Sequence, residues 1–186
     1  MRLKVFKRER TTKSESNRIR REGNVPAVLY VRGKLTEAII VDGAELSRLL
    51  RAVQPGRLST TIFSLKDEHG KDRRAILKEI QYEPTTYKVQ HLDFEELFDD
   101  NKVTLSVPIE CTGVVDCVGV KLGGVLRQVI RKLRVRCLPK DIPTFFTIDV
   151  KNMGQSDKIR LAELKIPETV RPIANLNEVA VIIAKR

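Results

Sequence analysis

The chain has 186 residues, 41% of them hydrophobic, which indicates one large or two small folded domains and argues against a disordered protein. No apolar run approaches the roughly 20 residues of a membrane span, and the N-terminus lacks the apolar core of a secretory signal, so the sequence predicts a cytoplasmic protein without membrane contact. The formal net charge of +11 is typical of proteins that bind a polyanion, most often nucleic acid.

Most of this charge lies at the N-terminus. Residues 1–34 hold eleven Lys and Arg against three Asp and Glu, whereas the other 152 residues hold 24 against 21. A solvated, self-repelling tail is the simplest alternative explanation. The concentration of the excess positive charge at the N-terminal end nevertheless favours a polyanion-binding segment.

The three cysteines do not have the spacing of a metal site. Cys111, Cys117 and Cys137 lie six and twenty positions apart among valines and leucines, and both histidines are distant in sequence. Zinc sites favour closely spaced cysteine pairs. We interpret the thiols as small buried side chains and expect neither a metal nor another cofactor.

The chain begins with an expected strand in which Leu3 and Val5 alternate with lysines and face inward. Residues 8–17 are polar and form an exposed arm that leads into a short helix within residues 14–22. This helix ends at Gly23, a residue type that tolerates a left-handed backbone. Its only apolar residue is Ile19, so its many arginines require a reason other than packing.

The rest of the first half alternates between strands and turns. Residues 25–31 and 36–41 are expected to form a hairpin, followed by a helix that starts with the capping signal Asp42 and Glu45 and ends before Pro55. Further strands are expected over 60–65, 74–82 and 87–94. Five or six antiparallel strands with two helices fit a closed or nearly closed barrel, which removes exposed sheet edges.

A second β-rich part follows the acidic stretch Glu95–Asn101. Alternating polar and apolar residues predict strands at 103–110, 132–137 and 146–150, and an apolar strand at 178–184. We therefore expect a mainly β protein with an RNA-binding barrel domain over 1–95, a linker over 96–101 and a C-terminal β domain over 102–186. Leu97 and Phe98 could attach the linker to either domain.

Three glycines near the middle of the second part allow two interpretations. Gly119, Gly123 and Gly124 could cradle a phosphate, but no phosphate-loop motif accompanies them. Backbone geometry in a loop or bulge is the simpler explanation.

His91 and Asp93 lie two positions apart on an expected strand, so both side chains point to the face opposite Leu92 and Phe94. The carboxylate can hold one imidazole tautomer and leave the other ring nitrogen for a partner. No nucleophile or metal motif accompanies the pair, so catalysis is not indicated. An RNA contact and an ordinary surface pair remain the alternatives.

Tyr30 ends the strand that leaves the basic helix, where it is either a half-buried barrel residue or a platform for a base. Aromatic residues make up 5% of the chain and tryptophan is absent, unlike in the aromatic sheets of single-strand binders. Structured, largely double-helical RNA is therefore the expected target.

Two sets of motifs resemble a known family. The pattern of Arg8 with S-x-x-x-x-R-R-x-G-x-V-P-A-V-L-Y and Q-H-L-D-F resembles bacterial ribosomal large-subunit protein twenty-five. VPIECTG, GVKLGGVL and NEVAVI resemble the second domain of its long form, the general stress protein CTC family. The resemblance covers nearly the whole chain. It implies a six-stranded barrel that binds loop E, the irregular internal helix of 5S ribosomal RNA.

The resemblance also implies which residues contact RNA. The matched positions are Arg8, Arg20, Tyr30, His91 and Asp93, with Ser16, Arg18 and Lys88 as weaker matches. Arg21 lies in the same basic helix. The arm between Arg8 and Arg20 is longer than in some relatives, and Arg10 replaces Arg8 if this length shifts the alignment with the family. Val31 follows the strand tyrosine, where many members have glycine, and the long acidic tail of some relatives is missing.

The sequence therefore predicts a non-enzymatic component of the large ribosomal subunit that binds 5S ribosomal RNA. Its other expected partners are large-subunit components, and the free protein is expected to be a monomer. The alternative is a free RNA-binding stress factor or RNA chaperone that visits ribosomes. An RNA-processing enzyme that uses His91 would lack a catalytic set of residues.

Overall fold

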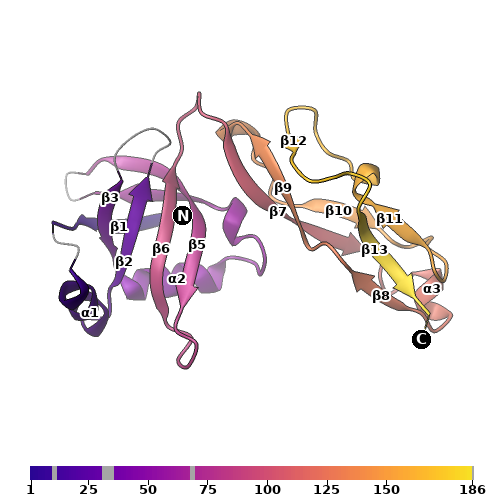
Figure 1. The fold of residues 1–186 in the computed structure, drawn as a ribbon, viewed down its shortest axis with the longest axis horizontal. Coiled ribbons are helices and arrows are strands. Elements are labelled where there is room, and N and C mark those ends of the chain that lie inside the picture. The colour runs from indigo at the N-terminus through magenta and orange to yellow at the C-terminus, as the bar shows by residue number, and fades with distance from the viewer. Residues whose placement is uncertain (10–11, 31–35, 68–69, 186) are drawn as a thin grey trace. The chain divides into compact units, whose positions relative to one another are not determined.

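The chain forms two compact units in a computed structural model that describes residues 1–9, 12–30, 36–67 and 70–185. The first unit is Met1–Asn101 and the second is Lys102–Arg186 (Figure 1). Both are mainly β structure, as the alternation of polar and apolar residues predicts. Among the described residues, no helix has the length and apolar character needed to cross a membrane.

The first unit is a closed barrel of six strands in the order β1-β3-β2-β6-β5-β4, which confirms the predicted barrel and its two helices. One hairpin joins β2 to β3, and two more join β4 to β5 and β5 to β6. Helix α2 lies between β3 and β4 along the chain. Its elements are β1 (Arg2–Lys7), α1 (Lys13–Arg21), β2 (Val25–Tyr30), β3 (Glu37–Val41), α2 (Gly43–Ala52), the 3-10 turn η1 (Leu58–Thr60), β4 (Ile62–Lys66), β5 (Asp72–Tyr82) and β6 (Val89–Glu96).

The barrel is not wholly antiparallel, which corrects one part of the sequence prediction. β1 pairs in parallel with β4, and β2 pairs in parallel with β6. Each half of the barrel is a three-stranded antiparallel sheet, and the two edges of such a sheet run in the same direction. When two of these halves close on each other, both joints must therefore be parallel or both antiparallel. Here β4 runs opposite to β3, the strand that precedes it along the chain, and both joints are therefore parallel.

The barrel interior is filled by alternate residues of every strand. Leu3 and Val5 are 0% and 2% exposed, which confirms that they face inward. Phe63 and Phe94 meet edge to face with their ring centroids 5.9 Å apart. Leu46 of α2 belongs to the same core cluster, and Leu49 and Leu50 pack against it, so this helix packs on the barrel.

The acidic stretch at 96–101 is held by the first unit. Leu97 is buried, and its N–H donates to the carbonyl oxygen of Arg74 over 2.7 Å. The Arg74 guanidinium also lies 2.7 Å from a carboxylate oxygen of Asp99. The chain therefore passes to the second unit after Asn101.

The second unit contains a four-stranded sheet in the order β10-β7-β9-β12 and a three-stranded sheet in the order β11-β13-β8. Outward lysine and arginine alternate with buried residues along β9, as predicted. Its elements are β7 (Val103–Thr112), α3 (Val118–Lys121), β8 (Val125–Gln128), β9 (Lys132–Cys137), η2 (Pro139–Asp141), β10 (Phe146–Asp149), β11 (Lys158–Arg160), η3 (Leu161–Glu163), β12 (Arg171–Pro172) and β13 (Val179–Ala184).

Gly119 lies in α3 and not in a loop, and close packing explains the glycine. A Cβ atom there would lie 2.7 Å from the backbone of Gly154, and one at Gly124 would lie 2.7 Å from the carbonyl oxygen of Gly119. The backbone interpretation of these glycines is therefore the one that the structure supports.

The cysteines are free, but only two are fully buried. Cys117 and Cys137 are buried, whereas Cys111 is partly exposed, which corrects the prediction for that residue. Burial raises the pKa of the Cys111 and Cys137 thiols, with a further contribution from Asp141 at Cys137. Within the described ranges, no cluster of His, Cys, Asp and Glu could hold a metal ion.

Candidate nucleic-acid interface

Helix α1 is fixed to the barrel by Ile19, its one buried side chain. Its C-terminus closes in a Schellman motif, because the Asn24 N–H donates to the carbonyl of Ile19 and the Gly23 N–H to that of Arg20. Gly23 has φ +83°, the left-handed backbone predicted for it. The helix thus uses a single apolar residue for packing and leaves its arginine side chains on the surface.

A second glycine joins α1 to α2. A Cβ atom at Gly43, the first residue of α2, would lie only 2.0 Å from the carbonyl oxygen of Gly23. No side chain fits in that space, so the end of α1 and the start of α2 are in backbone contact. Asp42 caps α2 by accepting a hydrogen bond from the Glu45 N–H over 2.9 Å, as the capping signal predicts.

Arg20 connects α1 to the start of β6. Its Nε donates to the carbonyl oxygen of Gln90 over 3.2 Å, and its Nη1 donates to Oδ1 of Asn17 over 3.3 Å. These two bonds hold the guanidinium at the backbone of β6, one residue before His91 in the sequence. Since a lysine has no such fork, only arginine can make both contacts and still present a further donor.

His91 and Asp93 point to the same side of β6, while Leu92 and Phe94 are fully buried on the other, as predicted. Nδ1 of His91 lies 2.7 Å from Oδ1 of Asp93, and the two side chains are 26% and 30% exposed. The contact has the distance of an ion pair, although its angle is not that of an aligned hydrogen bond. It occupies Nδ1 and leaves Nε2 for a partner.

Tyr30 is half-buried at the end of β2, opposite Glu95 in the pairing of β2 with β6. Burial raises the pKa of its hydroxyl above 10.0, and the carboxylates of Glu95, Asp93 and Glu79 raise it further. The phenol is therefore a neutral hydrogen-bond donor at physiological pH, on the same side of the barrel as Asp93. The intermediate burial agrees with a barrel residue that keeps its polar end at the surface.

Arg8, which follows β1, and Ser16 of α1 form a second group. Nη2 of Arg8 donates to Oγ of Ser16 over 2.8 Å and to the carbonyl oxygen of Thr12 over 3.3 Å. Arg18 lies along the outer surface of the helix between Glu15 and Glu22, at 3.9 and 3.7 Å. Arg10, the alternative to Arg8, lies outside the described residues.

Arg21 and Lys88 line a groove between the end of α1, helix α2 and the β5–β6 hairpin, with a volume of about 980 Å³. Arg51, Tyr82 and Tyr87 also line it. Sequence reasoning missed these three residues, because helix periodicity and strand pattern do not show which surface side chains converge. The one available signal was a pair of tyrosines that flank a predicted turn.

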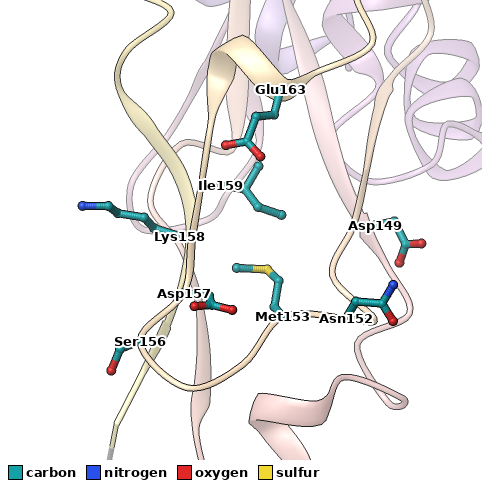
Figure 2. Close-up of a pocket in the computed structure, with 8 residues that line it drawn as sticks. All are labelled: Asp149, Asn152, Met153, Ser156, Asp157, Lys158, Ile159 and Glu163. Carbon is teal, nitrogen blue, oxygen red and sulfur yellow. The ribbon is translucent and has the colours of Figure 1, made fainter.

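A second hollow, of about 470 Å³, lies in the second unit and is lined by residues of the β10–β11 region (Figure 2). Its carboxylates shape local turns: Asp149 accepts from the Lys151 N–H, Asp157 from the Gly154 N–H, and Glu163 from the Arg160 N–H. Lys158 points away from the other lining side chains in Figure 2. The polar groups of this hollow thus stabilise the backbone around it.

Comparison with known proteins identifies both units. The model of the Ribosomal L25p family matches residues 3–94, and the model named Ribosomal protein TL5, C-terminal domain, matches residues 102–186. The chain is 50% identical over 186 residues to the large ribosomal subunit protein bL25 of Chlamydia trachomatis serovar L2 and to that of Chlamydia abortus. It is 47% identical over the same length to bL25 of Chlamydia muridarum, and each comparison covers all of both chains. The barrel, the second β unit and full-length identity of this extent agree with one another, and the chain belongs to the bL25 family of bacterial ribosomal proteins, in its long form.

Proposed function

We propose that this chain is a structural component of the large ribosomal subunit in the cytoplasm and binds 5S ribosomal RNA at loop E. The binding face consists of α1, the end of β2 and the outer face of β6. The observation that carries the proposal is the contact of Arg20 with Gln90, which brings the guanidinium of α1 to the backbone of β6, one residue before His91 in the sequence. The resemblance of these positions to the RNA-contacting positions of the family supports the choice of RNA.

The chemistry of this face suits an A-form helix. Such a helix presents 2′-hydroxyls and base edges in a wide, shallow minor groove, which short polar groups and guanidinium groups can reach. Arg20 and Arg21 would contact phosphates, while Tyr30 and Nε2 of His91 would hydrogen-bond hydroxyls or base edges. Arg8, Ser16, Arg18 and Lys88 would extend the contact along the RNA, and Arg10 is the alternative to Arg8.

Family membership also bears on catalysis and on partners. The bL25 family consists of ribosomal structural proteins, and we propose that this chain likewise acts by binding, without an enzymatic reaction. Other large-subunit components would then surround it in the ribosome, and the unbound chain would be a monomer.

Sedimentation distinguishes this function from that of a free RNA-binding stress factor or RNA chaperone. Cell extract is centrifuged at increasing salt, and the chain is measured in the large-subunit fraction. An integral component stays with large subunits that keep their 5S RNA. Release at low salt, before any 5S RNA leaves, would favour the transient factor. Weak electrostatic contacts alone are lost first because salt screens them.

Titration of purified protein with 5S RNA tests the assignment of the face. Removing one contact to a charged or closely fitted partner costs about 1–3 kcal/mol, which corresponds to a five- to hundredfold loss of affinity. Arg20→Ala and His91→Ala should both lose affinity in this range. Lys165→Ala in the second unit is the matched control and should bind as the wild type does. Equal binding by all four proteins would contradict the proposed face.

A further inference from the structure

The groove between α1, α2 and the β5–β6 hairpin has the charge of a nucleic-acid site and extends beyond the proposed face. Figure 1 shows the tip of this hairpin at the end of the barrel where α1 and α2 lie. Among the described residues that line the groove are four cations, Arg20, Arg21, Arg51 and Lys88, and one acid, Glu83. The Glu83 carboxylate accepts a hydrogen bond from the Thr86 hydroxyl within the same turn.

The hairpin tip is held in one conformation. The Tyr87 N–H donates to the carbonyl oxygen of Glu83, and the Glu83 N–H to that of Lys88, both over 2.8 Å. These bonds and the Thr86 hydroxyl leave the tip little freedom. Tyr87 is thus presented from a rigid turn, which reduces the entropy lost when a ligand binds to its ring.

Tyr87 is an unexpected residue for this position. Its φ is +55°, in the left-handed region that favours glycine and is strained for a bulky side chain. Its side chain is also 79% exposed, so it contributes little to the core. Glycine would form the same turn without strain, and a large exposed ring on a strained backbone is a typical sign of a surface contact.

We propose that this groove holds an unpaired nucleotide of the bound RNA, with its base stacked on Tyr87 and its flanking phosphates near Arg21, Arg51 and Lys88. Aromatic rings beside cations are the usual means of holding an unstacked base and its backbone. A regular duplex has no free base face to stack, whereas an irregular RNA helix does. This inference rests on the proposed function and adds Tyr87 of the β5–β6 hairpin and Arg51 of α2, two residues that the family resemblance does not include.

Three variants at one position test the stacking. Tyr87→Gly removes the ring and suits the left-handed backbone, so it keeps the turn. Its affinity for a 5S RNA transcript should fall about 5- to 100-fold, the loss typical of removing one stacking ring. Tyr87→Phe keeps the ring and should bind as the wild type does. Tyr87→Trp introduces the sole tryptophan of the chain, and RNA should quench its fluorescence.

Arg51→Gln tests the charge of the groove apart from the ring. The slope of log affinity against log salt should become shallower by about 1, the change expected for one lost phosphate contact. Arg48→Gln, an exposed residue of the same helix that is not among the groove residues, is the matched control and should leave the slope unchanged.

The outcomes separate this inference from the proposed function. Unchanged affinity of Tyr87→Gly, together with weak binding by His91→Ala, would overturn the groove site and leave the RNA-binding face in place. A wild-type chain that does not bind the transcript at all would overturn both proposals. A tryptophan signal that responds to RNA-free ribosomal proteins but not to the transcript would make the groove a protein site and also overturn the inference.

Discussion

His91 and Asp93 occupy alternate positions on β6, so both side chains leave the barrel on the side opposite its core. Nδ1 and Oδ1 are 2.7 Å apart, and we propose that the carboxylate orients the ring with a proton on Nδ1. In this arrangement Nε2 is an acceptor that suits a 2′-hydroxyl or an amino group of a base. At the scale of single residues, we therefore propose that any RNA contact of the imidazole depends on Asp93.

Asp93→Asn tests that dependence through the sign of its effect. We expect weaker binding to 5S RNA, by about 1 kcal/mol or more, because an amide orients the imidazole less strongly than a carboxylate does. If Asp93 had no such role, removing its charge would reduce repulsion from the phosphates and tighten binding slightly. Circular dichroism and thermal melting of the variant must accompany the titration. A folded variant that binds more tightly than wild type would contradict the proposal that Asp93 orients the imidazole of His91.

Tyr30 gives a prediction about pH. Burial and the carboxylates of Glu95, Asp93 and Glu79 raise the pKa of its hydroxyl in the folded chain above the ordinary value of 10.0. The folded state therefore retains a proton that the unfolded state releases, and the free energy of unfolding falls as pH rises from about 10 toward the raised pKa. Tyr30→Phe should lack this part of the decline.

The measurement for Tyr30 is a set of denaturant titrations of both proteins at several alkaline pH values. The difference between the two proteins isolates Tyr30, because the Cys111 and Cys137 thiols, whose pKa values are also raised, are present in both. Parallel stability curves for wild type and Tyr30→Phe above pH 10 would show that the tyrosine does not titrate in this way.

At the scale of elements, the arrangement of α1 depends on a contact between two glycines. Only a residue without a Cβ atom fits at Gly43, because the carbonyl oxygen of Gly23 would lie 2.0 Å from that atom. The first turn of α2 therefore fixes where α1 ends, and α1 in turn places Arg20 beside β6. Backbone packing between two short helices thus sets the geometry of the arginine contact.

Gly43→Ala should disturb this contact and the function together. We expect the free energy of unfolding to fall by about 2–3 kcal/mol, which is typical of an extra methyl group forced into a closely packed site. Affinity for 5S RNA should fall as well, because α1 must move away from β6. Denaturant unfolding and RNA titration measure the two effects. Arg48→Ala, an exposed substitution on the same helix, is the control and should change stability by less than about 0.5 kcal/mol.

At the scale of the whole molecule, net charge does not show which unit binds RNA. Residues 1–101 carry 20 Lys and Arg against 16 Asp and Glu, a net of +4, whereas residues 102–186 carry 15 against 8, a net of +7. The first unit combines a basic segment of net +8 over residues 1–34 with an acid-rich remainder. We therefore base the proposed assignment of RNA binding to the first unit on the concentration of cations within residues 1–34, and not on the total charge of the unit.

A fragment of residues 1–101 should keep the binding of the full chain. We expect its affinity for 5S RNA to lie within about threefold of the full-length value, because every proposed contact lies in this unit. Neutralisation of five to seven phosphates would give a slope of log affinity against log salt of about −4 to −6 for both proteins. Circular dichroism of the fragment verifies its fold. Binding retained instead by residues 102–186 would show that the assignment of the RNA site to the barrel is wrong.

Many features of this fold could be predicted from local sequence. The inward positions of Leu3 and Val5, the cap at Asp42 and the left-handed turn at Gly23 depend on neighbouring residues and on intrinsic backbone preferences. The shared outer face of His91 and Asp93 follows from the alternation of a strand in the same way. Local rules of this kind predicted five or six strands and two helices in a closed or nearly closed barrel, whereas the number of six strands came from the family resemblance.

The tertiary structure determined what depends on contacts between distant segments. Antiparallel hairpins could be predicted, but the direction in which the two halves of the barrel join could not, because a crossover through a helix permits either direction. Three features bring together residues from separate elements. They are the contact of Arg20 with Gln90, the packing of Gly43 on Gly23, and the groove that Tyr87 lines. The physical reason is the same in each case: strand alternation and helix periodicity assign a side chain to a face of its own element, and only the packing of the elements decides which faces meet.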